Sequence, residues 1–296
     1  MINCRIAATL YSDPACPWAY SESPALRVIE WRYGDQLDWR LVLIGLSEDT
    51  SAAVALGYTT TIGAVSRAAF RDRFGMPMSA VPKERMSAST RACRAVISAR
   101  LELPGSEWHV FRAIQLAYFT GPMLLDDDAG LRDAVATVDG VDADRIVALI
   151  DSREVWNAYD ADRVATRRAA GSPTEFQGKA RNSDGLVRYS APSLVFESAD
   201  GRALEAGGFQ PVEAYDVLIA NLDPELDRRE PPEDPEQLLK YFPHGLTSQE
   251  VAALMTAGND RPDRAAAEAM MLELVGAGRA RAQRLASDSL WLPIAA

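Results

Sequence analysis

The chain has 296 residues, of which 48% are hydrophobic and 25% charged, and its formal net charge is −11. This composition is typical of a globular protein with a sizeable core. An acidic surface repels phosphate groups, which argues against nucleic acid and anionic membranes as general partners. Since no apolar run reaches the ~18 residues of a membrane span, no membrane segment is expected.

The N-terminal residues predict a strand, a helix and a second strand. Residues 5–11 are apolar enough for a strand, and Ser-Asp-Pro at 12–14 predicts a turn. Helical spacing then runs over 16–33 and ends at Gly34, and residues 38–46 predict the next strand. This is a βαβ opening with a cysteine at the start of its helix.

The middle of the chain predicts helices between two β-rich parts. Residues 48–185 are expected to form an all-helical insertion, because apolar positions recur with helical spacing from 88 to 170. A strand is expected within 186–198, and Asp200-Gly201 predicts a hairpin turn. Gly207 and Gly208 then precede a helix that ends near residue 222. The proline-rich, charged residues 223–235 are expected to be a linker.

Residues 236–296 are expected to form a winged-helix-like module. Thr247 and Glu250 have the spacing of a capping box, a second helix is expected at 262–277, and 279–292 predict a hairpin. The second helix carries acids and alanines instead of a basic base-reading set. Packing on the rest of the chain or on a second subunit, as a homo-oligomer, is therefore favoured over DNA binding.

Cys16, in the stretch SDPACPWAY, is the candidate nucleophile. A helix N-terminus presents unpaired N–H groups and a positive dipole end, which favour the thiolate, and Pro17 suits the first helical position. An inert buried cysteine is the alternative. Three cysteines and two histidines without metal-ligand spacing predict no metal site and reduced thiols in the cytoplasm. Three aspartates at 126–128 are expected to begin a helix and not to bind metal.

SDPACPWAY, LRVIEWRYGDQLDWRLVLIGL and RYSAPSLVF together resemble the DsbA-like disulfide oxidoreductases, especially the FrnE-like branch. The resemblance covers residues 1–222 and implies an α/β, thioredoxin-like fold with a large helical insertion. It implies that Pro192 is a cis-proline beside Cys16. It further implies that Ala191 offers backbone groups to a substrate, with Pro17 and Trp18 lining the same site.

Ala19 departs from the family pattern, since it replaces the second cysteine of CPWC. A dithiol enzyme resolves its mixed disulfide with that second cysteine. Cys4 and Cys93 are expected to pack in the structure. The predicted function is therefore thiol–disulfide exchange at one cysteine, resolved by an external thiol. No tightly bound cofactor is expected, and glutathione or mycothiol is the candidate co-substrate.

Gly207 and Gly208 are candidates to hold a carboxylate of the thiol at a helix N-terminus, or they form an ordinary turn.

Two other functions stay open at this point. A thiol-dependent isomerase or transferase, similar to 2-hydroxychromene-2-carboxylate isomerase or the kappa-class transferases, predicts stable binding of the reduced thiol. A non-catalytic protein adaptor predicts that partner binding survives loss of Cys16.

Overall fold

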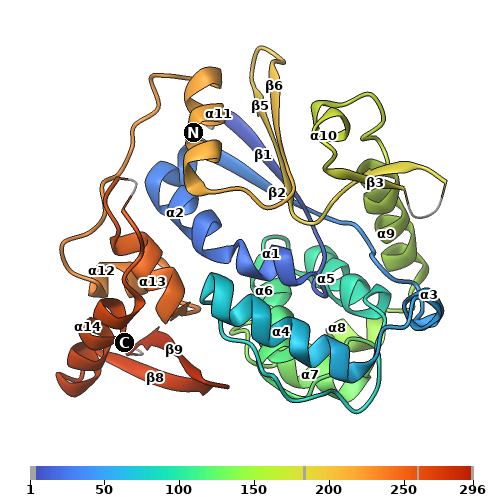
Figure 1. Ribbon diagram of the computed structural model, residues 1–296, viewed down its shortest axis with the longest axis horizontal. Coiled ribbons are helices and arrows are strands. Elements are labelled where there is room, and N and C mark those ends of the chain that lie inside the picture. The colour runs from blue at the N-terminus through green and yellow to red at the C-terminus, as the bar shows by residue number, and fades with distance from the viewer. Residues whose placement is uncertain (1–4, 183–184, 259, 295–296) are drawn as a thin grey trace.

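The computed structural model describes residues 5–182, 185–258 and 260–294. Its centre is a four-stranded sheet in the order β2-β1-β5-β6 (Figure 1). The strands are β1 (Ile6–Ser12), β2 (Leu37–Leu43), β5 (Ser193–Ser198) and β6 (Ala203–Gly207). β1 runs parallel to β2 and antiparallel to β5, and β5 runs antiparallel to β6. The end of the central strand β1 therefore leads directly into the Cys16 stretch.

Two helices follow β1 where the sequence predicts one. They are α1 (Pro17–Ser21) and α2 (Ser23–Tyr33), with Glu22 between them. After α2 the 3₁₀ helix η1 (Gly34–Gln36) leads into β2. Helix α11 (Val212–Leu222) contacts α2, β5 and β6, so these two long helices cover one face of the sheet.

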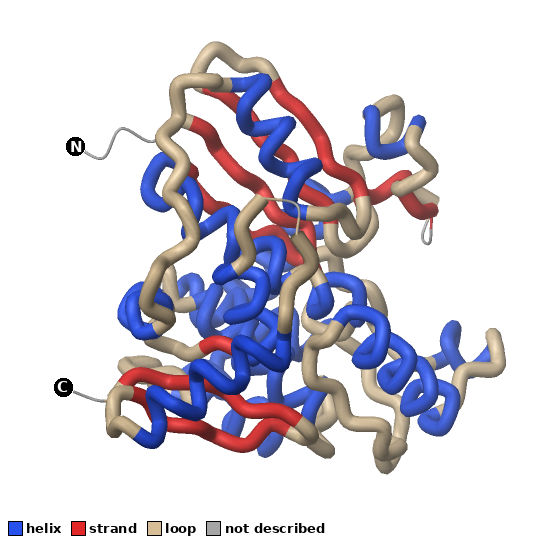
Figure 2. The backbone as a smooth tube through the Cα atoms, turned by 60° about the vertical axis from the view of Figure 1, so that its left-hand side comes forward, coloured by secondary structure: helices blue, strands red, loops and turns tan. Residues whose placement is uncertain are grey.

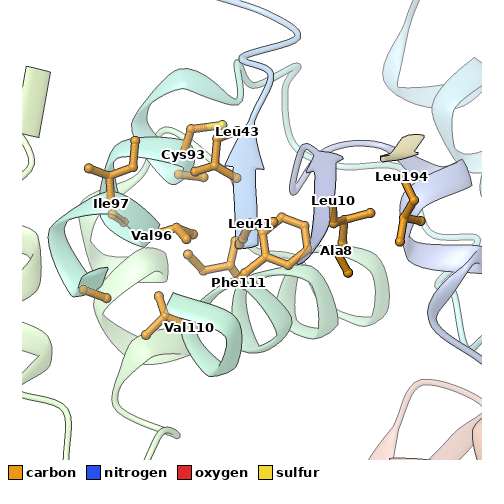
Figure 3. Close-up of a cluster of buried hydrophobic side chains, with 14 of the residues drawn as sticks. Ala8, Leu10, Leu41, Leu43, Cys93, Val96, Ile97, Val110, Phe111 and Leu194 are labelled. Atoms are coloured by element: carbon orange, nitrogen blue, oxygen red, sulfur yellow. The ribbon is translucent and has the colours of Figure 1, made fainter. Parts of the chain in front are cut away.

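A helical insertion between β2 and β5 covers the other face of the sheet. Its helices are α3 (Ser51–Ala55), α4 (Thr60–Phe74), α5 (Thr90–Glu102), α6 (Glu107–Thr120), α7 (Asp128–Val135), α8 (Ala143–Leu149), α9 (Arg153–Thr166) and α10 (Pro173–Phe176). Side chains of α5 and α6 join those of the strands in one buried cluster (Figure 3). Phe111 of α6 and Leu41 of β2 belong to it, so the insertion shares the core of the sheet.

The insertion is not purely helical, which corrects the prediction for residues 48–185. Strands β3 (Ala180–Asn182) and β4 (Val187–Tyr189) pair as a small antiparallel hairpin. The strand expected within 186–198 is divided into β4 and β5 by residues 190–192. Pro192 accounts for the break, because a proline lacks the N–H that a ladder needs.

Residues 236–294 form a third sheet with helices, here called the C-terminal module. Its elements are α12 (Glu236–Tyr241), β7 (Leu246–Thr247), α13 (Ser248–Met255), α14 (Arg264–Gly276), β8 (Ala280–Leu285) and β9 (Asp288–Pro293). The sheet order is β7-β9-β8. Thr247 and Glu250 form the capping box of α13 that their spacing predicts.

Residues 223–235 contain no helix or strand but lie against α2. Figure 2 traces them within the loop that runs from the sheet to the C-terminal module. The guanidinium of Arg229 lies over the rings of Trp31, at 4.6 Å, and Tyr241, at 5.0 Å. The indole N–H of Trp31 donates to the carbonyl of Glu230 at 2.9 Å. The segment predicted to be a linker is therefore docked on the rest of the chain around Arg229 and Glu230.

A buried ion pair fastens the C-terminal module to both other parts of the chain. Arg112 of α6 donates to both carboxylate oxygens of Glu250 of α13, at 2.6 and 2.7 Å. Ser23 of α2 donates to the same carboxylate. Neither Arg112 nor Glu250 has more than 7% of its surface exposed. The module is thus part of the structural core.

Candidate active site around Cys16

Cys16 is the N-cap residue of α1, and Pro17 occupies the first helical position. Its thiol donates to the carbonyl of Ala191, with Sγ and O 3.2 Å apart. The Ala191–Pro192 peptide bond is cis. The structure therefore brings Cys16, Pro17, Ala191 and Pro192 together, although 175 positions separate Cys16 from Ala191.

The thiol of Cys16 does not have the lowered pKa that its helix position predicts. Burial raises the pKa of Cys16 to about 12. The backbone N–H groups of Ala19 and Trp18 act in the opposite direction, and the nearby carboxylate of Asp13 adds to the rise. Because α1 has only five residues and Cys16 is 5% exposed, desolvation outweighs the helix terminus.

A buried carboxylate, Asp13, holds the loop in front of Cys16. Its Oδ1 accepts from the N–H of Ala15 at 2.8 Å, and its Oδ2 accepts from the N–H of Leu46 at 2.7 Å and the hydroxyl of Ser89 at 2.9 Å. Burial raises the pKa of Asp13. Its carboxylate therefore joins the Cys16 loop to the helical insertion. The sequence predicted only a turn at Asp13 and gave no indication of this role.

The other two cysteines have different positions. Cys93 is fully buried in α5, and its thiol lies 3.5 Å from Oδ2 of Asp13, which agrees with the packing role predicted for it. Burial raises its pKa well above the ordinary value. Cys4 lies outside the described residues.

Trp18, two residues after Cys16, is 40% exposed. Its ring contacts Phe70 and Phe74 of α4, at centroid distances of 4.8 and 5.6 Å, and Phe209 of the β6–α11 loop at 5.7 Å. We refer to these four residues as the aromatic cluster. Trp18 was predicted from the motif, whereas the three phenylalanines were not, because they come from distant segments that carry no motif of their own.

Gly207 and Gly208 do not begin a helix, which corrects the premise of their predicted role. They lie at and just after the end of β6, and α11 begins at Val212. A Cβ on Gly207 would lie 2.7 Å from Cγ2 of Thr174, and the N–H of Gly208 donates to Oγ of Ser193 at 3.1 Å. Gly208 also has φ of +71°, which favours glycine. Close packing and a turn therefore account for both glycines.

Ala19, at the position of a second cysteine, is buried beside a small cavity of about 30 Å³. Pro192 and Ser12 line the same cavity. The next residue, Tyr20, stacks on Phe119 with ring centroids 4.5 Å apart and belongs to a buried cluster that also contains Leu290 of β9. The active-site helix and the C-terminal module therefore share a buried cluster.

Glu22 is a fully buried acid at the break between α1 and α2. Its Oε1 accepts from the hydroxyl of Tyr215 at 2.7 Å, and its Oε2 accepts from the N–H of Gln210 at 3.3 Å. Burial raises the pKa of Glu22 to about 8, against 4.5 for an ordinary glutamate. The carboxyl group thus links the active-site helix to the loop that carries Phe209.

We expect Glu22→Gln to be more stable than the natural chain at pH 9. Between pH 4.5 and 8 the folded state keeps a proton that the unfolded state releases, so the free energy of unfolding falls as pH rises. The neutral amide removes this loss, which is on the order of a few kcal/mol. Urea unfolding at pH 5 and pH 9 measures it, with the exposed Glu213→Gln as control. An equal pH dependence in Glu22→Gln and the natural chain would contradict the assignment.

None of the helices in the described part of the chain is long and apolar enough to cross a membrane. No protein-family model and no curated protein matches the sequence.

Several solved structures are similar to this chain. A putative protein disulfide isomerase from Nitrosomonas europaea has a TM-score of 0.54 and 21% identity, covering 73% of this chain and 97% of its own. A probable DsbA oxidoreductase from Streptomyces coelicolor has a TM-score of 0.54 and 18% identity, covering 77% and 93%. The cytosolic disulfide reductase DsbM from Pseudomonas aeruginosa has a TM-score of 0.52 and 18% identity, covering 73% and 98%. Together with the mixed sheet, these likenesses identify the fold of this chain as the DsbA-like thioredoxin fold.

Proposed function

We propose that this protein is a thiol–disulfide oxidoreductase that acts through a single cysteine, Cys16, in the manner of a FrnE-like DsbA relative. The observation that carries the proposal is the position of the Cys16 thiol, 3.2 Å from the carbonyl of Ala191 and next to the cis Ala191–Pro192 bond. An extended substrate that pairs with the backbone of Ala191 brings its sulfur to Cys16. Pro17 and Trp18 border that position.

The proposed reaction has two exchange steps. The Cys16 thiol loses its proton and attacks one sulfur of a substrate disulfide, so that the new S–S bond forms as the old one breaks. The departing thiolate takes up a proton. An external thiol then attacks the mixed disulfide, forms a disulfide with the substrate sulfur, and releases Cys16 as a thiol. Because Ala19 has no sulfur, the second step requires that external thiol.

A low-molecular-weight thiol such as glutathione or mycothiol is the proposed co-substrate, within the cytoplasm. DsbM from Pseudomonas aeruginosa has been solved with GSH, at a TM-score of 0.51 and 17% identity to this chain, which supports testing glutathione first. The backbone of Gly208 is already hydrogen-bonded within the protein, so we do not assign the thiol's carboxylate to Gly207 and Gly208.

The C-terminal module is proposed to be of the winged-helix type and to serve as support for the active-site helix. Its order of elements, with α13 and α14 followed by the β8–β9 hairpin, is consistent with that type. Tyr20 and the Arg112–Glu250 pair bind it to the rest of the chain. This packing is the reason to propose a structural role instead of DNA binding.

We expect Cys16→Ser to lose mixed-disulfide formation completely, while Cys93→Ala keeps it. In the natural chain the adduct with oxidised glutathione should form slowly at pH 7 and about tenfold faster per pH unit up to pH 10. The reason is that only the thiolate reacts and its fraction rises in this way below a pKa near 12. Intact mass spectrometry against time and pH measures both. A rate that levels off near pH 7 would contradict the burial of the thiol.

A protein adaptor is the second candidate, and the protonated, buried state of Cys16 favours it. In that case no adduct forms at any pH, and Cys16→Ala binds the same partners as the natural chain. The same mass spectrometry experiment therefore separates the two functions.

A further inference from the structure

An open pocket of about 650 Å³, here called the arginine pocket, lies where the end of α4 meets the C-terminal module (Figure 1). Residues 71–75 line it from α4 and its C-cap. The C-terminal module contributes Gln249, Arg261, Pro262, Arg264 and Ser287. Phe74 belongs both to this lining and to the aromatic cluster that contains Trp18. The arginine pocket therefore borders the surroundings of the candidate active site.

The arginine pocket is positively charged, although the net charge of the chain is −11. One acid, Asp72, lines it together with four arginines, Arg71, Arg73, Arg261 and Arg264. Arg71 pairs with Asp72 at 2.8 Å, and Arg264 pairs with the buried Asp288 at 3.3 Å. Within the part of the chain that the structure describes, the exposed Arg73 and Arg261 take part in no ion pair. The lining thus has two positive charges without a carboxylate partner.

The two sides of the arginine pocket are packed against each other. Gly75, the C-cap of α4, lies against Gln249 of α13, so that a Cβ at Gly75 would lie 2.0 Å from Oε1 of Gln249. The next residue, Met76, is fully buried, and its sulfur accepts from the hydroxyl of Thr247 at 3.4 Å. This packing holds arginines from α4 and from the C-terminal module around one space, where an anionic group meets guanidinium groups from both sides.

The chemistry of the arginine pocket favours carboxylates carried by a polypeptide. Guanidinium groups pair with carboxylates and phosphates through parallel hydrogen bonds. A nucleic-acid backbone is disfavoured, because it brings a continuous row of charges to an acidic protein, and the exposed Asp72, Asp260 and Asp263 flank the arginines in the sequence. Single acidic side chains bring their charges one at a time, which suits a local excess of two.

The position of the arginine pocket connects it to the exchange reaction proposed for Cys16. The ring of Trp18, two residues after Cys16, lies 5.6 Å from the ring of Phe74, which lines the pocket. An extended polypeptide advances about 3.3 Å per residue. A polypeptide with its sulfur at Cys16 can therefore continue across Trp18 and Phe74 to the arginines. A small disulfide at Cys16 has no such continuation.

We propose that the arginine pocket selects polypeptide substrates that carry acidic side chains on one flank of the reacting cysteine. This inference rests on the function proposed for Cys16. Arg73 and Arg261 supply the charge that the acidic flank neutralises. Because the rest of the acidic surface repels such a flank, the pocket also fixes the direction in which the substrate lies across the aromatic cluster.

Two peptide disulfides test the proposal on the full chain, one flanked by glutamates and the other by glutamines at the same positions. Intact mass spectrometry at pH 9 and low ionic strength follows the mixed disulfide at Cys16. Hydroxyethyl disulfide, which is small and uncharged, measures the reactivity of Cys16 alone. We expect the glutamate peptide to react about tenfold faster than the glutamine peptide, and high salt to remove this difference.

Variants of the two unpaired arginines connect the difference to the pocket. Replacing both by glutamine, Arg73→Gln with Arg261→Gln, should make the two peptides react at equal rates and leave the rate with hydroxyethyl disulfide unchanged. Replacing both by lysine keeps the charges and should keep most of the difference. Arg145→Gln, an exposed position on α8, is the control and should behave as the natural chain.

The experiment separates failure of this inference from failure of the proposed function. If hydroxyethyl disulfide reacts and the natural chain does not distinguish the peptides, or the double glutamine variant still does, the inference is wrong and exchange at Cys16 stands. If no disulfide reacts, exchange at Cys16 is wrong. Fluorescence anisotropy of the glutamate peptide with serine in place of its cysteine then tests recognition alone, and equal binding to the natural chain and the double glutamine variant would overturn it. Tighter binding of a single-stranded oligonucleotide of equal charge would assign the pocket to nucleic acid instead.

Discussion

Arg112→Met is expected to cost about 3–5 kcal/mol of the free energy of unfolding, the largest loss among the substitutions considered. The substitution removes both hydrogen bonds that Arg112 makes to Glu250 and leaves a buried carboxylate without its main partner. Urea unfolding at pH 7 measures the loss. Arg132→Met removes a similar pair with Asp144 at the surface and should cost less than about 1 kcal/mol.

The same ion pair makes the free energy of unfolding depend on pH between about 2 and 4.5. Arg112 holds the pKa of Glu250 at about 2, below the 4.5 of an ordinary glutamate, in spite of burial. Its contribution is complete above pH 4.5 and is lost as pH falls toward 2. The difference in stability between pH 7 and pH 3 should therefore shrink in Arg112→Met. If that variant does not fold, Glu250→Gln provides the same comparison. An unchanged difference in the variant that folds would contradict this account.

Ala19→Cys is expected to convert the site into a dithiol and to raise insulin reduction by dithiothreitol at least tenfold. Residues 16 and 19 are one helical turn apart, which is within the Cα separation that a disulfide needs. The cavity of about 30 Å³ beside Ala19 provides room for the added sulfur. The new thiol resolves the mixed disulfide at Cys16 without an external thiol.

The control for this gain is Ala19→Ser, which adds an atom of similar position but no sulfur and should stay at the natural rate. In Ala19→Cys, peptide mass spectrometry after mild oxidation should also detect a disulfide between positions 16 and 19. If that disulfide forms and reduction does not increase, the missing second cysteine is not what limits the natural chain.

Local motifs predicted the parts of the site that are close in sequence. The first strand, the position of Cys16 and the neighbouring Pro17 were predictable because each depends only on residues that are close to it in the sequence. Pro192 was placed beside Cys16 only through the family resemblance, since proline alone does not specify a distant neighbour. The direction of the Cys16 pKa was wrong because the motif locates the helix terminus but contains no information about burial.

The parts that were missed depend on contacts between distant segments. Phe70 and Phe74 lie on a helix that the sequence did not single out, and their role is visible only where α4 meets Trp18. An arginine such as Arg112 in an amphipathic helix looks like a surface residue until Glu250 is found opposite it, 138 positions away. Gly207 and Gly208 were interpreted from their sequence alone as a candidate carboxylate site. In the structure, Thr174 lies so close to Gly207 that it leaves no room for a side chain there.

The support that the C-terminal module gives to α1 has a consequence for the order in which the molecule is completed. Ser23 and Glu250, which meet in the finished structure, are separated by 227 positions, so the module leaves the ribosome long after the Cys16 stretch. Until then the buried cluster around Tyr20 lacks the residues that β9 supplies to it. The surroundings of the active-site helix are therefore completed only after β9 has been synthesised.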